Sequence, residues 1–172
     1  MARANSKIVK VVVNSTPIIT LATVGYFSLL NHLFDEIFIP TSVYEEVVVK
    51  GRNRPGMSEV MASTWINIQS PTLQSPIPVQ LFGLDPGEQD VILLGQEIGA
   101  DWLLIDEKLA RRVADAMGFQ IKGSLGLLLI GYRTGLLSKL EALEALRLLD
   151  SSSVRLSRKL LRWFESELSK TN

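Results

Sequence analysis

The chain has 172 residues, of which 47% are hydrophobic, and its formal net charge is zero. It has one histidine and no cysteine, which excludes thiolate chemistry, disulfides and histidine-rich metal sites and suits a reducing cytoplasm. Zero net charge argues mildly against a constitutive nucleic-acid binder. No apolar run reaches the roughly 20 residues that span a bilayer, so we expect a cytoplasmic protein with no membrane partner.

The first half of the chain alternates short apolar runs with helical patterns. An apolar, β-branched run over 8–13 predicts a buried strand. Thr16 followed by Pro17 predicts a helix that begins there and continues to about Leu33. Ser42 and Glu45 have the spacing of a capping box at the start of the next helix. The other predicted elements are a strand over 37–39, a helix over 41–51, a short helix over 57–63, a short strand over 65–68 and an extended connection over 70–78.

The second half has clearer boundaries. Asp85-Pro86-Gly87-Glu88 combines a helix N-cap, a proline at the first position and an acid at the third, and predicts a helix that runs to Gly99. The remaining predicted elements are a strand over 101–105, a helix over 108–117, a strand over 119–122, helices over 124–132 and 137–149, and an amphipathic helix after Ser157.

This order of elements predicts an α/β fold. Strands alternate with helices and lack polar alternation, which is typical of a mostly parallel sheet covered by helices on both faces. We expect a single domain over 1–172, with a core at about 8–137 and extra C-terminal helices at about 138–170. Those helices are either an appendage or an interaction arm. Their apolar side chains should pack against the domain or another subunit: Leu160, Leu161, Trp163, Phe164 and Leu168.

Acidic and amide side chains follow the carboxyl ends of the predicted strands, where parallel sheets place their sites. Asn14 follows the first strand, Glu46 lies in the helix after the second, and Asp106 and Glu107 follow the 101–105 strand. Glu88 and Asp90 lie in the first turns of another helix. If the strands are neighbours, these side chains meet in one cleft. Without histidine or thiolate, such a site suits Mg²⁺ or Mn²⁺, which activate water and hold phosphate oxygens.

Each of these residues also has a purely structural explanation. Glu88 completes a capping box with Asp85, Asp106 can cap the helix from Lys108, and Asn14 can close an Asx-turn. Glu45 belongs to its own capping box, so Glu46 is the better site candidate of the two. Asp90 is harder to explain structurally, because one acid already satisfies the helix dipole.

Four segments in order resemble a PIN-domain protein, and are similar to toxin ribonucleases of prokaryotic type II toxin–antitoxin systems. They are VVVNSTPIITLATVGYFSLL, IPTSVYEEV, LDPGEQDVILLGQEIGADWLLIDEKLARRVADAMGF and KGSLGLLLIGYRTGLL. The resemblance covers most of 11–137 and fits the final helices more loosely. It implies a three-layer α/β/α sandwich and a Mg²⁺- or Mn²⁺-dependent endoribonuclease that acts on single-stranded RNA. It also suggests a cognate antitoxin protein, and we expect a homodimer.

The resemblance assigns roles by position. It places the family's acids at Glu46, at Glu88 or Asp90, and at Asp106, and we take Glu46, Asp90 and Asp106 as the catalytic acids. The metal would be held by these three together with Glu88, Glu107 and Asn14, and the small hydroxyl residue of the family falls on Thr16, which would contact the substrate. A ribonuclease also needs cations near the acids, so we expect Arg111 and Arg112, or the 50–54 loop, to contact RNA phosphates.

Asn14 departs from the family pattern, in which this position is an acid. An amide has no negative charge and cannot act as a base, so weakened activity is expected. The alternative is a catalytically impaired, nuclease-like module that binds RNA or a protein.

Overall fold

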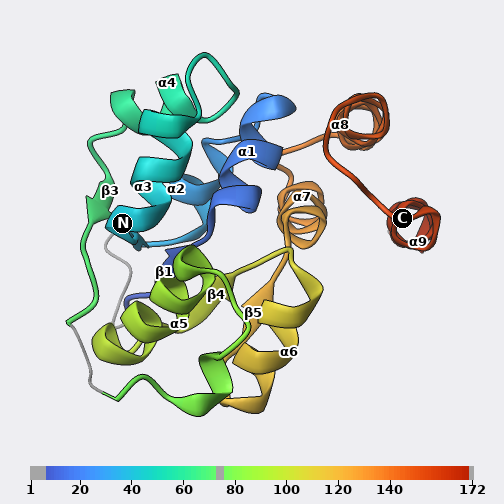
Figure 1. The fold of residues 1–172 in the computed structure, drawn as a ribbon. Helices are drawn as coiled ribbons and strands as arrows, with labels where there is room; N and C mark the ends of the chain where they lie inside the picture. The colour runs from blue at the N-terminus through green and yellow to red at the C-terminus, as the bar shows by residue number, and fades with distance from the viewer. Residues whose placement is uncertain (1–6, 73–75, 171–172) are drawn as a thin grey trace.

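The computed structural model describes residues 7–72 and 76–170, which fold around a five-stranded parallel sheet (Figure 1). The strand order is β3-β2-β1-β4-β5, so β1 and β4 are neighbours at the middle of the sheet. The predicted mostly parallel sheet is confirmed, because every adjacent pair of strands runs in parallel. The strands are β1 (Lys10–Val13), β2 (Glu36–Ile39), β3 (Ile66–Ile68), β4 (Trp102–Leu104) and β5 (Ile121–Lys122).

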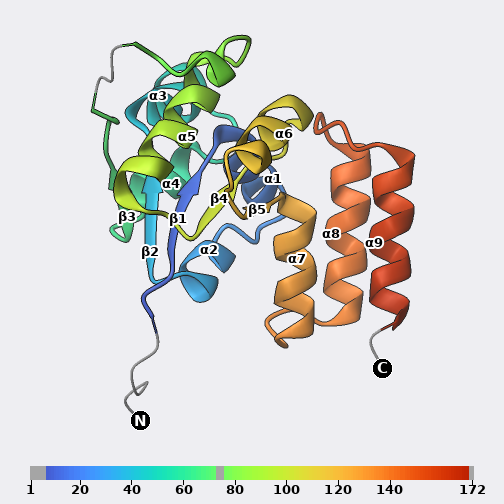
Figure 2. The same cartoon turned by 90° about the horizontal axis from the view of Figure 1, so that it is seen from below.

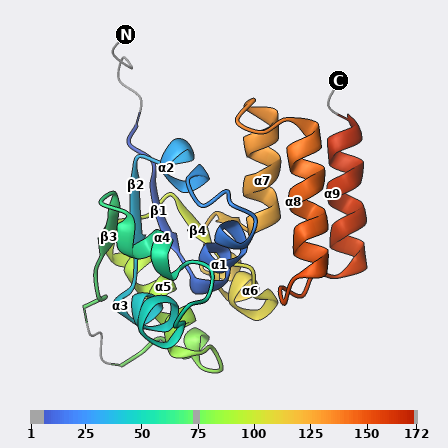
Figure 3. The ribbon, with the colours of Figure 1, turned by 90° about the horizontal axis from the view of Figure 1, so that it is seen from above.

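Helices cover both faces of this sheet, as expected for a three-layer sandwich. Helix α5 (Pro86–Ile98) packs against β1 and β4, while α1 (Ser15–Thr23) packs against α7 (Ser124–Arg133). Helices α7, α8 (Lys139–Ser151) and α9 (Arg158–Lys170) lie side by side at one side of the domain (Figures 2 and 3). The other helical segments are α2 (Leu29–Leu33), α3 (Thr41–Tyr44), the π-helix η1 (Glu45–Lys50), α4 (Met57–Ala62), the 3₁₀-helix η2 (Val79–Leu81) and α6 (Lys108–Ala116).

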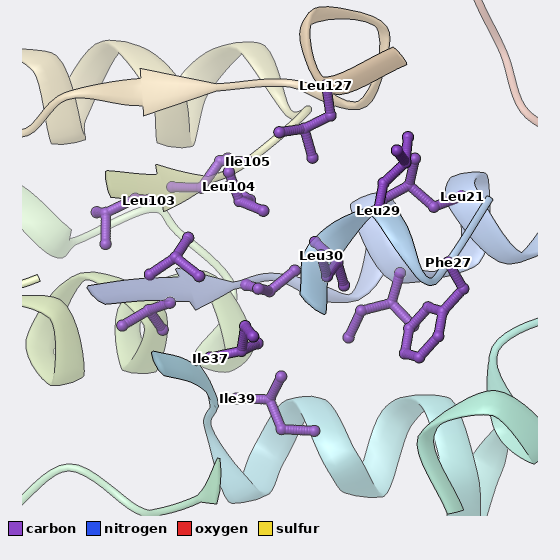
Figure 4. Close-up of a cluster of buried hydrophobic side chains, with 14 of the residues drawn as sticks. Leu21, Phe27, Leu29, Leu30, Ile37, Ile39, Leu103, Leu104, Ile105 and Leu127 are labelled. Carbon is purple, nitrogen blue, oxygen red and sulfur yellow. The ribbon is translucent and has the colours of Figure 1, made fainter. Parts of the chain in front are cut away.

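The core lies between the sheet and these helices. Val11, Val12 and Val13 of the central strand are completely buried, as are Leu103 and Leu104 of its neighbour. Side chains from the strands and from α1, α2 and α7 form one apolar cluster (Figure 4). Because both faces of a parallel sheet are covered, its strands are apolar at successive positions instead of alternating with polar residues. Among the described residues, no helix is both long enough and apolar enough to cross a bilayer.

The helix predicted from Thr16 to Leu33 is two helices. Helix α1 begins one residue earlier, because Asn14 caps it with a side-chain oxygen that accepts from the Ser15 N–H at 2.9 Å. Helix α1 ends at Thr23, and Gly25 then takes the left-handed conformation (φ +77°). That conformation is accessible to glycine at little cost, so the chain turns before α2 begins at Leu29.

The capping box predicted for Ser42 and Glu45 is wrong. Pro40 precedes α3 and makes no side-chain cap, and the Ser42 hydroxyl donates instead to Asp90 of α5 at 2.6 Å. After Tyr44 the helix widens into the π-helix η1, which buries Val47 and Val48 and leaves Glu46 exposed. A tertiary contact has therefore replaced the local one.

The C-terminal helix packs onto the domain. Phe164 and Leu168 are completely buried, and Arg133 of α7 forms an ion pair with Glu167 of α9 at 2.7 Å. Leu160 and Trp163 remain 38% and 41% exposed. The predicted apolar burial against the domain is therefore confirmed for the inner face of α9, and the outer part of the helix is partly open to solvent.

Replacing Phe164 with alanine should destabilise the protein by about 3–5 kcal/mol, the usual cost of emptying a buried phenylalanine site. Urea denaturation followed by circular dichroism measures this loss. Arg162→Ala, an exposed change on the same helix, should stay within about 0.5 kcal/mol of the unchanged protein. Equal stability of both variants would mean that α9 contributes nothing to the fold.

Candidate functional site

Four of the candidate site residues, Asn14, Thr16, Asp106 and Glu107, lie together at the carboxyl ends of β1 and β4. These strands lie where the strand order reverses, the position at which open parallel sheets form their binding crevices. Asn14 directly follows β1, and its backbone N–H donates to the carbonyl of Leu104 at 3.0 Å. Asp106 and Glu107 follow β4 after one further buried residue. The sheet thereby brings together side chains more than 90 positions apart in the sequence.

The Glu107 carboxylate is held through both of its oxygens. The Asn14 side-chain amide donates to Glu107 Oε2 at 3.2 Å, and the Thr16 hydroxyl donates to Oε1. Asn14 itself is buried, and its own oxygen is used in capping α1. An aspartate at position 14 would place a second carboxylate beside Glu107, with a repulsion of roughly 4 kcal/mol at 4 Å and an effective dielectric near 20. The amide avoids this repulsion and supplies a donor in its place.

Asp106 is fixed by the first residue of α7. Its carboxylate accepts from the Ser124 N–H at 2.8 Å and from the Ser124 hydroxyl. Burial raises the pKa of Asp106 and the charge of Glu107 adds to this, while Ser124 and Arg111 act in the opposite direction. A Cβ atom at Gly123 would lie 2.8 Å from Asp106 Oδ1 and 3.0 Å from Arg111 Nη1, so a larger residue there would displace these two side chains.

Glu88 lies at the N-terminus of α5 and is 7% exposed. The capping box predicted from Asp85 is confirmed: Glu88 Oε2 accepts from the Asp85 N–H at 3.0 Å, and Asp85 Oδ1 accepts from the Glu88 N–H at 2.8 Å. Burial raises the pKa of Glu88, and the charges of Asp85, Glu107 and Glu46 raise it further. Glu88 therefore caps the helix and is also affected by the charges of the other acids.

Glu46 approaches the same helix end from η1. Its Oε2 atom lies 3.7 Å from the position that a Cβ atom on Gly87 would occupy. The side chain is exposed, so it can change rotamer without disturbing the core. Glu46, Glu88 and Glu107 are thus electrostatically coupled, although they come from three different helical segments or helix caps.

The other predicted site residues have different surroundings. Asp90 accepts from Ser42 and joins α5 to α3. Arg111 donates to the carbonyl of Ile105 at 2.8 Å beside Asp106, whereas Arg112 is exposed. Sequence reasoning missed Ser124 as the residue that holds Asp106. The only local signal was the helix start at Gly123-Ser124, which says nothing about a partner 18 positions away.

These residues can be tested for their fit to a metal ion. Within 7–72 and 76–170, no three acidic or histidine side chains are close enough together to hold a metal ion in this conformation. The available donors are nevertheless all oxygens. The charge of Glu107 acts on both Asp106 and Glu88, and the charge of Glu46 acts on Glu88. This donor chemistry fits a hard divalent cation. Binding would require a side-chain rearrangement, which the exposed Glu46 permits.

The chain is similar to a known protein family. A family model described as a PIN domain matches residues 10–170, which include every candidate site residue and the three C-terminal helices. No curated protein matches the chain.

Replacing Glu88 with glutamine should raise the melting temperature at neutral pH in buffer with EDTA. The folded protein raises the pKa of Glu88, so its ionised form costs stability. That cost is absent below the unfolded pKa of roughly 4.3 and fully present above the folded pKa. Glutamine removes the charge and keeps an oxygen for the Asp85 N–H, so the stabilisation should appear as pH rises from 4 to 8.

Thermal unfolding across this pH range measures the effect, with Glu165→Gln on the exposed side of α9 as the matched control. A Glu88→Gln variant that is less stable than the unchanged protein at every pH would show that the carboxylate is required structurally and is not under charge repulsion.

Proposed function

The chain belongs to the PIN-domain family, a family of nucleases, and on that premise we propose that it is a Mg²⁺- or Mn²⁺-dependent endoribonuclease that cuts single-stranded RNA. The observation that carries the proposal is the Glu107 carboxylate, fixed by Asn14 and Thr16 at the junction of β1 and β4. Asp106 directly precedes it in the sequence. The charge of Glu107 acts on both Asp106 and Glu88, and the charge of Glu46 acts on Glu88. Such a group of acids is of little use to the fold alone, because it costs stability.

We assign the metal ligands to Asp106, Glu107, Glu88 and Glu46. A divalent ion in such a site supplies an activated water and stabilises phosphate oxygens. Asn14 and Thr16 keep Glu107 in place, and Ser124 does the same for Asp106. Arg111 lies next to Asp106, where its guanidinium can contact a phosphate of the RNA.

In this proposal Asp90 has a positioning role instead of the catalytic role that its spacing suggested. Its carboxylate is used by Ser42, and this contact fixes α3, and with it η1, against α5. Glu88 then takes the place of the third acid, since it is the acid of α5 that the charges of Glu46 and Glu107 affect.

A specific observation favours the second candidate function, a nuclease-like module that binds RNA or protein without cutting. Asn14 contributes no charge, and its amide donates to Glu107 instead of offering a free oxygen to a metal.

A toxin-like role with an antitoxin partner and a homodimeric state extend the first proposal. Growth arrest on expression, abolished by Asp106→Asn, and size-exclusion chromatography with light scattering test these two extensions.

Cleavage of single-stranded RNA should require Mn²⁺ or Mg²⁺, and the three acids should differ in importance. Asp106→Asn and Glu88→Gln should each lower the rate by more than about 100-fold, since even outer-shell changes at metal sites cost 10–100-fold. Asp90→Asn keeps an oxygen for Ser42 and should remain within a few-fold of the unchanged protein. Single-turnover kinetics on a labelled oligonucleotide measures all three rates.

The converse ranking, with Asp90→Asn inactive and Glu88→Gln active, would reassign the third acid. Metal-independent binding of RNA with no cleavage by any form would favour the binding module.

Asn14→Asp should have opposite effects with and without metal. In EDTA it should lower the melting temperature, because a second buried carboxylate faces Glu107 with a repulsion of up to roughly 4 kcal/mol. Mn²⁺ should raise the melting temperature of this variant more than that of the unchanged protein, and cleavage should become faster. Differential scanning fluorimetry with a Mn²⁺ titration measures the first two effects.

Asn14→Ser is the matched control, since it removes the amide without adding charge. Identical Mn²⁺ responses of the aspartate and serine variants would mean that position 14 does not face the ion.

A further inference from the structure

A groove of about 820 Å³ leads away from Asp106 along the C-terminal helices. Its lining includes Thr16, Asp106 and Ser124 of the candidate site, and also Arg155 and Trp163. Its walls come from α7, α9 and the connection between α8 and α9. The volume lies within the range of about 300–1,000 Å³ that is usual for ligand sites. The C-terminal helices therefore border a space that reaches Asp106 of the candidate site.

The charges along this groove are mostly positive. Arg111, Lys122, Arg133 and Arg155 line it, with Asp106 as the single acid among its lining residues in the described part of the chain. Three of these cations already have contacts: Arg111 with the Ile105 carbonyl, Lys122 with the Trp102 ring at 4.2 Å, and Arg133 with Glu167.

Arg155 differs from the other three. It is exposed, and within 7–72 and 76–170 no hydrogen bond or ion pair engages it. Its guanidinium is therefore available to a ligand at no cost in existing contacts.

Trp163 adds an aromatic face to the lining of the groove. The indole is 41% exposed, although its neighbour Phe164 is completely buried and contacts it at a centroid distance of 6.5 Å. The buried ring anchors α9, so the exposed ring is held on a rigid element. A partly exposed tryptophan and an unpaired arginine in the lining of one groove suit single-stranded nucleic acid, through base stacking and phosphate contacts.

We propose that this groove binds the single-stranded segment next to the cleaved phosphodiester, with a phosphate on Arg155 and an unpaired base on Trp163. The inference rests on the proposed function and goes beyond it, because it makes the C-terminal helices a wall of the RNA site. A polyanion matches the excess of cations, and the groove opens directly onto Asp106 and Thr16. Stacking on Trp163 needs an unpaired base, so the groove also selects single strands over duplexes.

Fluorescence anisotropy with a labelled single-stranded RNA decamer, in EDTA to prevent cleavage, tests the groove directly. Trp163→Ala should weaken binding by about fivefold to a hundredfold, and Trp163→Phe by less. Arg155→Ala should weaken it severalfold and reduce the slope of log K against log salt by about 0.7. Arg158→Ala removes the same charge outside the groove and should leave affinity unchanged. A duplex of the same sequence should bind more weakly and respond less to Trp163→Ala.

Cleavage of a trinucleotide separates this inference from the function on which it rests. The unchanged protein should cut both the trinucleotide and the decamer with Mn²⁺, and Arg155→Ala should cut the decamer less efficiently through a higher KM. If Arg155→Ala, Trp163→Ala and Trp163→Phe all bind the decamer as tightly as the unchanged protein, the inference would be wrong and the proposed nuclease function would stand. A peptide would then be the remaining candidate ligand for the groove. If the unchanged protein cuts neither substrate but binds the decamer in a way that depends on Arg155, the proposed nuclease function would be wrong and the proposed RNA-binding groove would stand.

Discussion

The arrangement of this site depends on one constraint, which is that several carboxylates must share the carboxyl ends of two adjacent strands without a counter-charge from histidine. The protein meets it at Glu107 with neutral donors. Asn14 and Thr16 each donate to one oxygen of that carboxylate, so its charge is solvated by fixed dipoles where water is partly excluded. The amide at position 14 is therefore more than the loss of an acid. It reduces the number of charges in the cluster and stabilises one of those that remain.

Two helix N-termini extend the same principle. Glu88 lies in the first turn of α5 and Asp106 accepts from the first N–H of α7, so both acids lie at the positive ends of helix dipoles. Burial still raises the pKa of both groups, and the neighbouring acids add to this. The backbone thus offsets only part of the repulsion. A divalent cation would relieve the repulsion that remains. The proposed metal would therefore stabilise the fold as well as supply chemistry.

The sequence predicted features that depend on local physics and missed those that depend on tertiary contacts. Asp85-Pro86-Gly87-Glu88 was interpreted correctly because a capping box closes within four residues. Ser42 and Glu45 have the same spacing, yet Ser42 bonds to Asp90, 48 positions away. The parallel sheet followed from apolar strands, but no periodicity gives the strand order that puts Asn14 beside Glu107. The resemblance to PIN domains agrees with the family match over 10–170. The different surroundings of Glu88, which the charges of Glu46 and Glu107 affect, and of Asp90, which accepts from Ser42 of α3, could be seen only in the coordinates.

The C-terminal helices resolve an apparent conflict in the charge balance. A net charge of zero argued against nucleic-acid binding, because the electrostatic part of that affinity comes from cations that neutralise phosphates. That argument uses the average charge, whereas a strand of RNA interacts with the surface that it touches. The fold gathers four cations along one groove, and packs α9 against α7 through Phe164 and the Arg133–Glu167 pair. Local charge therefore depends on the packing of helices that lie outside the sheet. The proposed RNA site is compatible with a neutral protein because cations outnumber acids among the described residues that line this groove.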